Sequence, residues 1–277
     1  MIKKLYPNGK LRAFNVSYDD GVLQDVEFVR LLNKYGIKGT FNLNSGLMQQ
    51  EFAWMHECGM VVKRLSVDGA KAVYDGHEIA SHTLTHPNMH GMNAEQILRE
   101  MSQDKDNLEN IFGVKISGFA VPFSYYSELI AECAKIVGFE YGRTSDMSGG
   151  YSPSEDVYFW KPGRFHLSSE LESYVDVFLE TDEELAVCQI VGHSYDFDAE
   201  RNWDRIEALL KSVAEKEDVW FATHLEIVRY LKAMKKADIT EAFIENKSNM
   251  ELWFNMNGMT FSVLPGETWE FEKEESI

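Results

Sequence analysis

The sequence predicts an α/β fold in which helices alternate with parallel strands and the sheet forms a complete or incomplete barrel. Short β-prone runs alternate with stretches of helical spacing through residues 11–235. The composition, 44% hydrophobic and 26% charged residues, is typical of a globular protein. Residues suited to chemistry follow five of the strand-like runs: Asp19-Asp20, His82, Pro122, Arg143 and His193. In parallel α/β folds these strand ends build the active site.

Each predicted strand is a short apolar run that ends at glycine, proline or a polar residue. The runs cover 11–16, 36–43, 76–81, 118–122, 139–143, 185–191 and 219–223. The predicted helices carry apolar residues at a spacing of three or four. They cover 22–35, 70–74, 94–112, 127–137, 204–215 and 225–235. Asn93 and Gly113 are the expected caps of the strongest helix, and Gly138 is expected to end the next.

The pattern changes to β hairpins after Lys236. Residues 250–255 and 259–263 flank Asn257-Gly258, a dipeptide typical of tight hairpin turns, and 268–271 has the same character. We therefore expect a barrel domain over residues 1–236 and a small β extension over 237–277 packed on it. The acidic stretch 270–275 is expected to be a solvated edge.

Charge and cysteine content narrow the class of protein. A net charge of −18 argues against a nucleic-acid-binding face. No run reaches the roughly 20 apolar residues of a membrane span. Since no apolar leader follows Lys3 and Lys4, we expect a cytoplasmic protein. Cys58, Cys133 and Cys188 form no CxxC pair and are expected to be buried or inert thiols in a reducing compartment.

Two motifs point to a metal site. Asp19 and Asp20 are adjacent carboxylates, which repel each other unless a cation or a shared proton intervenes. His82 and His86 are four residues apart and can lie on one face of a helical turn. One carboxylate and two imidazoles form a metal site of the catalytic kind, which leaves the other carboxylate free to act on water. Taken singly, each motif is also compatible with a turn or with structural histidines.

The same motifs resemble those of a known family. Ser-Tyr-Asp-Asp-Gly at 17–21 and Ser-His-Thr-Leu-Thr-His at 81–86 resemble the first two motifs of the polysaccharide deacetylases, carbohydrate esterase family 4 with its NodB homology domain. Val191-Gly192-His193 resembles the last histidine motif of that family. The resemblance extends over residues 11–235. It implies a distorted (β/α) barrel of the NodB type and metal-dependent removal of acetyl groups from N-acetylated sugars.

The resemblance also implies a role for each matching residue. Asp19 would be the general base that takes a proton from water. Asp20, His82 and His86 would hold the metal, usually zinc, although other divalent ions suit these ligands. His193 would be the general acid, because an amine leaves poorly without a proton.

The third motif departs from the family pattern. Ala120 stands where the family carries an arginine that orients the base. We expect Arg143, at the end of the next strand, to replace it, and an ordinary exposed arginine is the alternative. Phe123 lacks the usual tyrosine hydroxyl, but its backbone N–H can still stabilise an oxyanion.

Further substrate-binding candidates come from the fourth motif region and from the segment after His193. Trp160 could stack on a sugar ring, with core packing as the alternative. Tyr195 lies in the polar segment after His193. His166 could line the pocket or be a loop residue. The sequence does not identify the residue that sets the pKa of His193.

We therefore expect a metal-dependent hydrolase that removes N-acetyl groups from a sugar or small saccharide. Hydrolysis of another amide, such as a cyclic ureide or imide, is an alternative. A non-catalytic carbohydrate-binding relative is a second alternative, although retention of the base, the three candidate ligands and His193 favours an enzyme.

Overall fold

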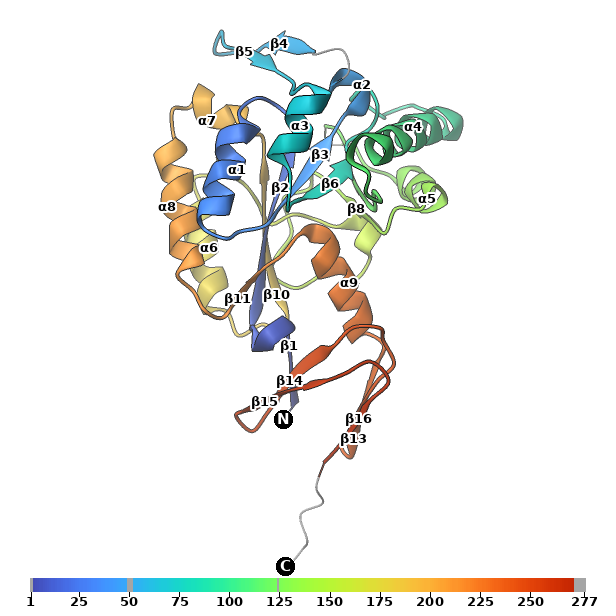
Figure 1. Cartoon of the computed structure of the whole chain (residues 1–277), viewed down its shortest axis with the longest axis vertical. Coiled ribbons are helices and arrows are strands. Elements are labelled where there is room, and N and C mark those ends of the chain that lie inside the picture. The colour runs from blue at the N-terminus through green and yellow to red at the C-terminus, as the bar shows by residue number, and fades with distance from the viewer. Residues whose placement is uncertain (1, 49–51, 124, 272–277) are drawn as a thin grey trace, which may run out of the picture.

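The computed structural model describes residues 2–48, 52–123 and 125–271. Within these ranges the central sheet has eight strands, all paired in parallel, in the order β8-β7-β6-β3-β2-β10-β9, with β11 beside the first half of β2. The strands are β2 (Arg12–Asp19), β3 (Gly39–Leu43), β6 (Glu78–Ser81), β7 (Gly118–Ala120), β8 (Tyr141–Arg143), β9 (Arg164–Phe165), β10 (Ala186–Gly192) and β11 (Val219–Phe221). The sheet curls into an incomplete barrel with helices outside it (Figure 1), which confirms the predicted fold class.

The helices pack apolar faces against this sheet. They are α1 (Asp25–Lys34), α3 (Val67–Val73), α4 (Ala94–Phe112), α5 (Glu128–Val137), α6 (Leu171–Glu180), α8 (Trp203–Ala214) and α9 (His224–Met234), with short α2 (Ser45–Met48) and α7 (Tyr195–Ala199). The expected caps of α4 are confirmed, because Asn93 and Gln96 form a capping box and Gly113 takes a φ of 70°. Gly138, with a φ of 88°, ends α5 as predicted. Among the described residues, no helix is both long and apolar enough to cross a bilayer.

The C-terminal segment forms two small antiparallel sheets. The predicted hairpin is confirmed as β14 (Leu252–Met256) and β15 (Met259–Val263), joined by Asn257 and Gly258, both with positive φ. The other sheet contains β12 (Ala237–Ile239), β13 (Phe243–Asn246) and β16 (Thr268–Glu270). Residues 272–275 of the acidic stretch lie outside the described residues.

The first strand of the chain joins the C-terminal sheet, which the sequence analysis did not foresee. β1 (Ile2–Leu5) pairs antiparallel with β14 at the bottom of Figure 1. An apolar cluster that includes Phe254 and Ile227 links these strands to α9. The division at residue 236 stays a prediction, and the extension sheet draws on both ends of the chain.

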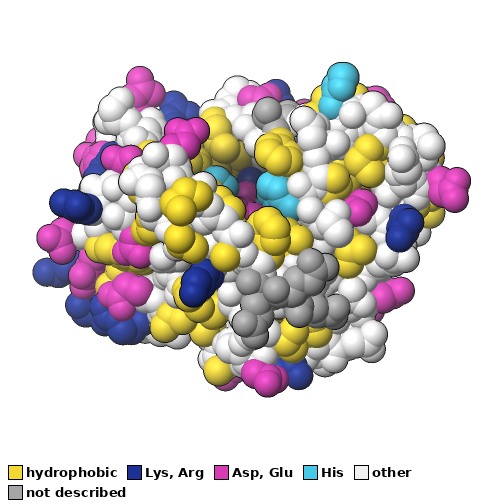
Figure 2. Space-filling view, turned by 90° about the horizontal axis from the view of Figure 1, so that it is seen from above, with side chains coloured by type: hydrophobic (Ala, Val, Ile, Leu, Met, Phe, Trp, Pro, Cys, Tyr) yellow, Lys and Arg dark blue, Asp and Glu magenta, His cyan; other side chains and the backbone are white. Residues whose placement is uncertain are grey.

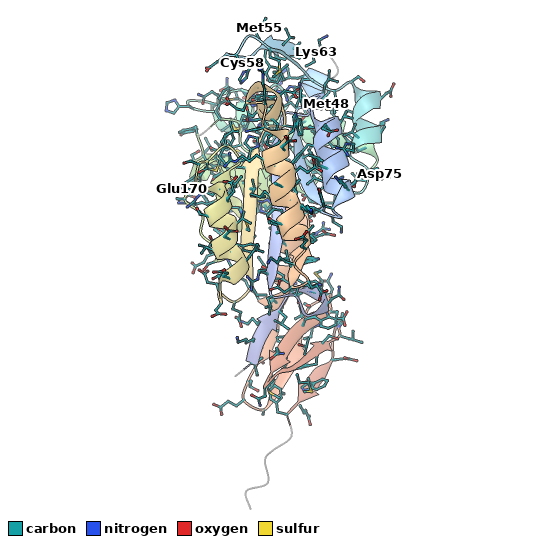
Figure 3. The ribbon with its side chains drawn as sticks, turned by 90° about the vertical axis from the view of Figure 1, so that its left-hand side faces the viewer. Met48, Met55, Cys58, Lys63, Asp75 and Glu170 are labelled. Atoms are coloured by element: carbon teal, nitrogen blue, oxygen red, sulfur yellow. The ribbon has the colours of Figure 1, made fainter. Side chains whose placement is uncertain are left out.

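A second hairpin lies at the opposite end of the molecule. β4 (Ala53–Met55) pairs with β5 (Val61–Lys63) beyond the barrel, where Met55, Cys58 and Lys63 are labelled in Figure 3. Cys133 and Cys188 are buried as expected, whereas Cys58 is exposed on this hairpin, and that this thiol is inert stays a prediction. The hairpin stands at the edge where the parallel strands β2, β6, β8 and β10 end (Figure 1).

Tyr230 on α9 ties the extension to the barrel and provides a test of this packing. Its buried hydroxyl donates to the carbonyl of Leu5 at 2.7 Å and accepts from the amide of Trp253 at 3.1 Å. Tyr230→Phe removes the hydrogen-bond partner of both backbone groups. We therefore expect the free energy of unfolding to fall by about 1–3 kcal/mol. Urea denaturation measures this loss, with Tyr125→Phe at an exposed site as the control. Equal midpoints for the two variants would contradict the linkage.

Candidate functional site

A cavity of about 340 Å³ opens at the carboxyl edge of the barrel. Figure 2 looks onto this edge and shows a hollow in which histidine and acidic side chains are visible, with hydrophobic side chains around it. The cavity is lined by Asp19, Asp20, His82, His86, Val121, Phe123, Arg143, Ser145, Met147, Phe165, Val191, Gly192, His193 and Tyr195. Residues from the ends of six strands, β2, β6, β7, β8, β9 and β10, therefore meet here, as parallel topology requires.

Asp20, His82 and His86 converge at the base of this cavity. One donor atom from each lies within 4.8 Å of the others. The expected helical turn between the histidines is wrong: residues 82–86 are irregular, with positive φ at Thr83 and His86. The Asn44 amide, by donating to the carbonyls of His82 and Thr83, holds this turn, and the two imidazole centroids lie 4.9 Å apart.

The three donor groups fit a divalent cation. Oδ1 of Asp20 is buried, accepts no hydrogen bond among the described residues, and lies 3.4 Å from Nε2 of His86. Ligands of a tetrahedral zinc ion lie about 3.4 Å from one another. Nδ1 of His82 lies 2.8 Å from the carbonyl of Ala120, so this nitrogen donates its proton and Nε2 keeps its lone pair. Burial lowers the pKa of His82 to about 4 and also lowers that of His86, so both are neutral near pH 7.

Asp19 lies beside this cluster and is paired with Arg143. The guanidinium donates to Oδ1 of Asp19, and the Asn42 amide donates to the same atom at 2.7 Å. Burial alone would raise the pKa of Asp19, but Arg143, His82 and His193 outweigh it and hold the pKa below its ordinary value. Arg143 is only 2% exposed, which excludes the alternative of an ordinary surface arginine.

His193 is held by a residue that the sequence analysis missed. Its Nδ1 donates to Oδ2 of Asp196 at 3.1 Å. Burial alone would lower the pKa of His193, but this hydrogen bond and the charges of Asp20 and Asp19 raise it to about 9. Asp196 is three residues further along, in α7, so the spacing could have suggested a contact once a helix was recognised there.

Asp196 also connects His193 to the strand that carries the base. Oδ2 of Asp196 accepts a second hydrogen bond, at 3.0 Å, from Nε2 of His166. Because burial lowers the pKa of His166, its Nδ1 accepts from the hydroxyl of Tyr18, 2.8 Å away. His166 therefore lies behind the cavity rather than in its lining.

The substrate-binding candidates divide into two groups. Phe123 and Tyr195 line the cavity, where Phe123 is 55% exposed and Tyr195 stacks on His193 at a centroid distance of 4.9 Å. Trp160 does not line it, which corrects the expectation of a stacking platform. Its ring is buried, 4.6 Å from that of His224, because the residue belongs to the second apolar cluster.

Arg64 contacts Asp20 from outside the cavity lining, a contact that the sequence analysis missed. It follows β5, is 5% exposed, and places Nη2 3.0 Å from Oδ1 of Asp20. Its Nη1 donates to the backbone carbonyl of Asp20 and to Oδ1 of Asn44. No local motif predicts this contact, because Arg64 comes 44 positions after Asp20 in the sequence.

Comparisons with known proteins agree with this site. The family model described as polysaccharide deacetylase matches residues 8–142. A chitin deacetylase of Pestalotiopsis sp is 29% identical over 130 residues, or 47% of this chain and 39% of that protein. The uncharacterized protein YlxY of Bacillus subtilis is 25% identical over 135 residues, or 48% of this chain and 37% of that protein. The chain thus spans less than half the length of these curated relatives.

Solved structures share the fold at low identity. The Xyl-CE4 domain of a multidomain xylanase from the hindgut metagenome of Trinervitermes trinervoides has a TM-score of 0.53 at 19% identity, covering 81% of this chain and 92% of that one. The peptidoglycan deacetylase PdaC of Bacillus subtilis has a TM-score of 0.52 at 16% identity, and the match covers 83% of this chain and 96% of that one. A CE4 family pseudoenzyme of Bacillus anthracis has a TM-score of 0.51 at 16% identity, and the match covers 82% of this chain and 68% of that one.

The family match begins before the Asp19-Asp20 motif and ends past the His82–His86 segment, so it includes the candidate base and all three candidate metal ligands. On these grounds residues 8–142 of the chain are similar to the polysaccharide deacetylase family.

Proposed function

We propose that this protein is a metal-dependent deacetylase that removes N-acetyl groups from a sugar or saccharide. One observation carries the proposal: a single cavity is lined by the candidate metal ligands, by Asp19 and by His193. Arg143 keeps Asp19 ionised, and Asp196 keeps His193 protonated. A base and an acid with pKa values driven apart beside a cation site are the groups that amide hydrolysis requires.

The substrate class rests on the relatives and on the cavity wall. Two of the similar proteins are named a chitin deacetylase and a peptidoglycan deacetylase, both of which point to acetylated saccharides. Phe123 and Tyr195 present aromatic rings beside the ligand cluster, and such rings suit the apolar faces of sugars. The lining also contains Val121, Phe165 and Val191, apolar side chains that suit the methyl of an acetyl group.

The chain's own residues account for the proton transfers. When bound by Asp20, His82 and His86, a divalent ion would lower the pKa of water and polarise the amide carbonyl. Asp19, unprotonated near pH 7, takes the proton of the attacking water. His193, protonated near pH 7, donates a proton to the departing amine. The backbone N–H of Phe123 is our candidate donor to the oxyanion, a position that needs no side chain.

A non-catalytic carbohydrate-binding protein is the competing proposal, since a structural neighbour is named a pseudoenzyme. The convergence of base, acid and three candidate ligands in one cavity supports an enzyme. Acetate release from N-acetylated chitooligosaccharides separates the two. Bound metal without release from any acetylated saccharide tested would favour the binding role.

The first prediction concerns the metal. We expect the protein to bind one divalent ion, to lose acetate release on chelation and to recover it when zinc is added back. His86→Ala removes a ligand and should weaken zinc affinity by at least about tenfold. Elemental analysis and competition with a chelating dye measure this, with His90→Ala on the exposed surface as the control. Undiminished zinc binding by His86→Ala would exclude the assigned site.

The second prediction concerns Asp19 and Arg143. Asp19→Asn removes the base, so we expect kcat to fall roughly 10²–10⁴-fold while metal content is retained. Arg143→Ala should also lower kcat, because Asp19 loses its orienting partner. Since Arg143 acts through Asp19, adding Arg143→Ala to Asp19→Asn should cost little more. If the losses of kcat from the two substitutions add in the double variant, Arg143 acts independently of Asp19 and has another role.

The third prediction concerns the pH profile. His193 acts in its protonated form, so activity should fall as pH rises through its pKa. Asp196 raises that pKa, and Asp196→Asn should therefore move the alkaline limb of kcat/KM to lower pH by about one unit or more. Asp198→Asn, on the exposed side of the same helix, is the matched control. An unmoved alkaline limb in Asp196→Asn would mean that His193 is not the acid.

A further inference from the structure

We propose that Arg64 is a built-in counter-ion that competes with the metal for Asp20 and so weakens metal binding. The inference rests on the proposed function, because it requires a divalent ion held by Asp20, His82 and His86. The inference adds to the proposed site a residue, Arg64, that lies outside the family motifs. It also assigns the site a property, which is moderate affinity for the metal ion.

The competition arises at a single oxygen atom. Oδ1 of Asp20 faces Nε2 of His86 at 3.4 Å and Nη2 of Arg64 at 3.0 Å. The carboxylate oxygen that points toward the imidazoles is therefore the one that Arg64 contacts. An ion bound there shares its anionic ligand with a guanidinium, and the two cations repel each other at close range.

Arg64 is fixed in place by the β4–β5 hairpin. Its guanidinium carbon lies 5.2 Å from the centre of the Trp54 ring. The backbone N–H of Arg64 donates to the carbonyl of Phe52 at 2.9 Å. The following residue, Leu65, donates its amide to the carbonyl of Gly21 at 2.8 Å. The guanidinium cannot move away from Asp20 without losing its contacts with the Trp54 ring, the backbone carbonyl of Asp20 and Oδ1 of Asn44.

The charges around the cavity are balanced before an ion is counted. Asp20 is paired with Arg64, Asp19 with Arg143 and Asp196 with His193. A divalent ion brings excess positive charge into this balanced set. Removal of the Arg64 charge would leave Asp20 buried and unpaired, which is costly unless a cation is bound.

The test compares metal affinity in variants of Arg64. Arg64→Met keeps an apolar stem against Trp54 and removes the charge, so we expect zinc to bind at least about tenfold more tightly. Arg64→Lys keeps a cation and should stay within about threefold of the wild type. Arg12→Gln, at a buried arginine near the start of β2, controls for the loss of any buried arginine and should leave affinity unchanged. Competition with a chelating dye gives the dissociation constants.

Thermal unfolding with and without zinc provides a second readout. Arg64→Met should have a lower Tm than the wild type without zinc and a larger gain in Tm when zinc is added. If Arg64→Met does not fold alone, folding on addition of zinc supports the proposal, and failure to fold with saturating zinc contradicts it. A folded Arg64→Met that binds zinc no more tightly than the wild type also contradicts it. A wild-type protein that binds no divalent ion would instead overturn the proposed function, and this inference with it.

Discussion

Two adjacent carboxylates buried at the end of one strand are the constraint on which the site depends. Asp19 and Asp20 are 9% and 4% exposed, and neither could remain ionised there without a cation. Each has its own arginine, Arg143 for Asp19 and Arg64 for Asp20. Because one arginine closes β8 and the other follows the β4–β5 hairpin, the ionised pair requires both elements to be in place.

The fold was predictable because its signals are local. Apolar runs, helical spacing and caps such as Asn93 and Gly113 depend on residues close together in the chain, and the structure confirms them. The elements that were missed include β9, only two residues long, and the β4–β5 hairpin, whose strands have three each. α6 was also missed, although Leu171, Tyr174, Val175 and Phe178 follow helical spacing and are buried.

The candidate site was predictable only in part, for a different physical reason. Motif order identified Asp20, His82 and His86, whose donor atoms do converge, and strand ends suggested Arg143. Arg64 and His166 escaped because their partners lie far away in sequence and no pattern encodes those contacts. Trp160 was misassigned because a large aromatic residue serves a sugar site or a core equally well, and burial alone distinguishes them. The roles of the site residues stay predictions.

The pairing of β1 with β14 has a practical consequence. These strands lie at the pole of the molecule opposite the cavity, and β16 lies at that pole too (Figure 1). An affinity tag, fluorophore or resin linker placed before β1 or after β16 would hang from the side remote from the mouth of the cavity. Immobilised protein could then be offered large, even insoluble, glycans without the support blocking their approach.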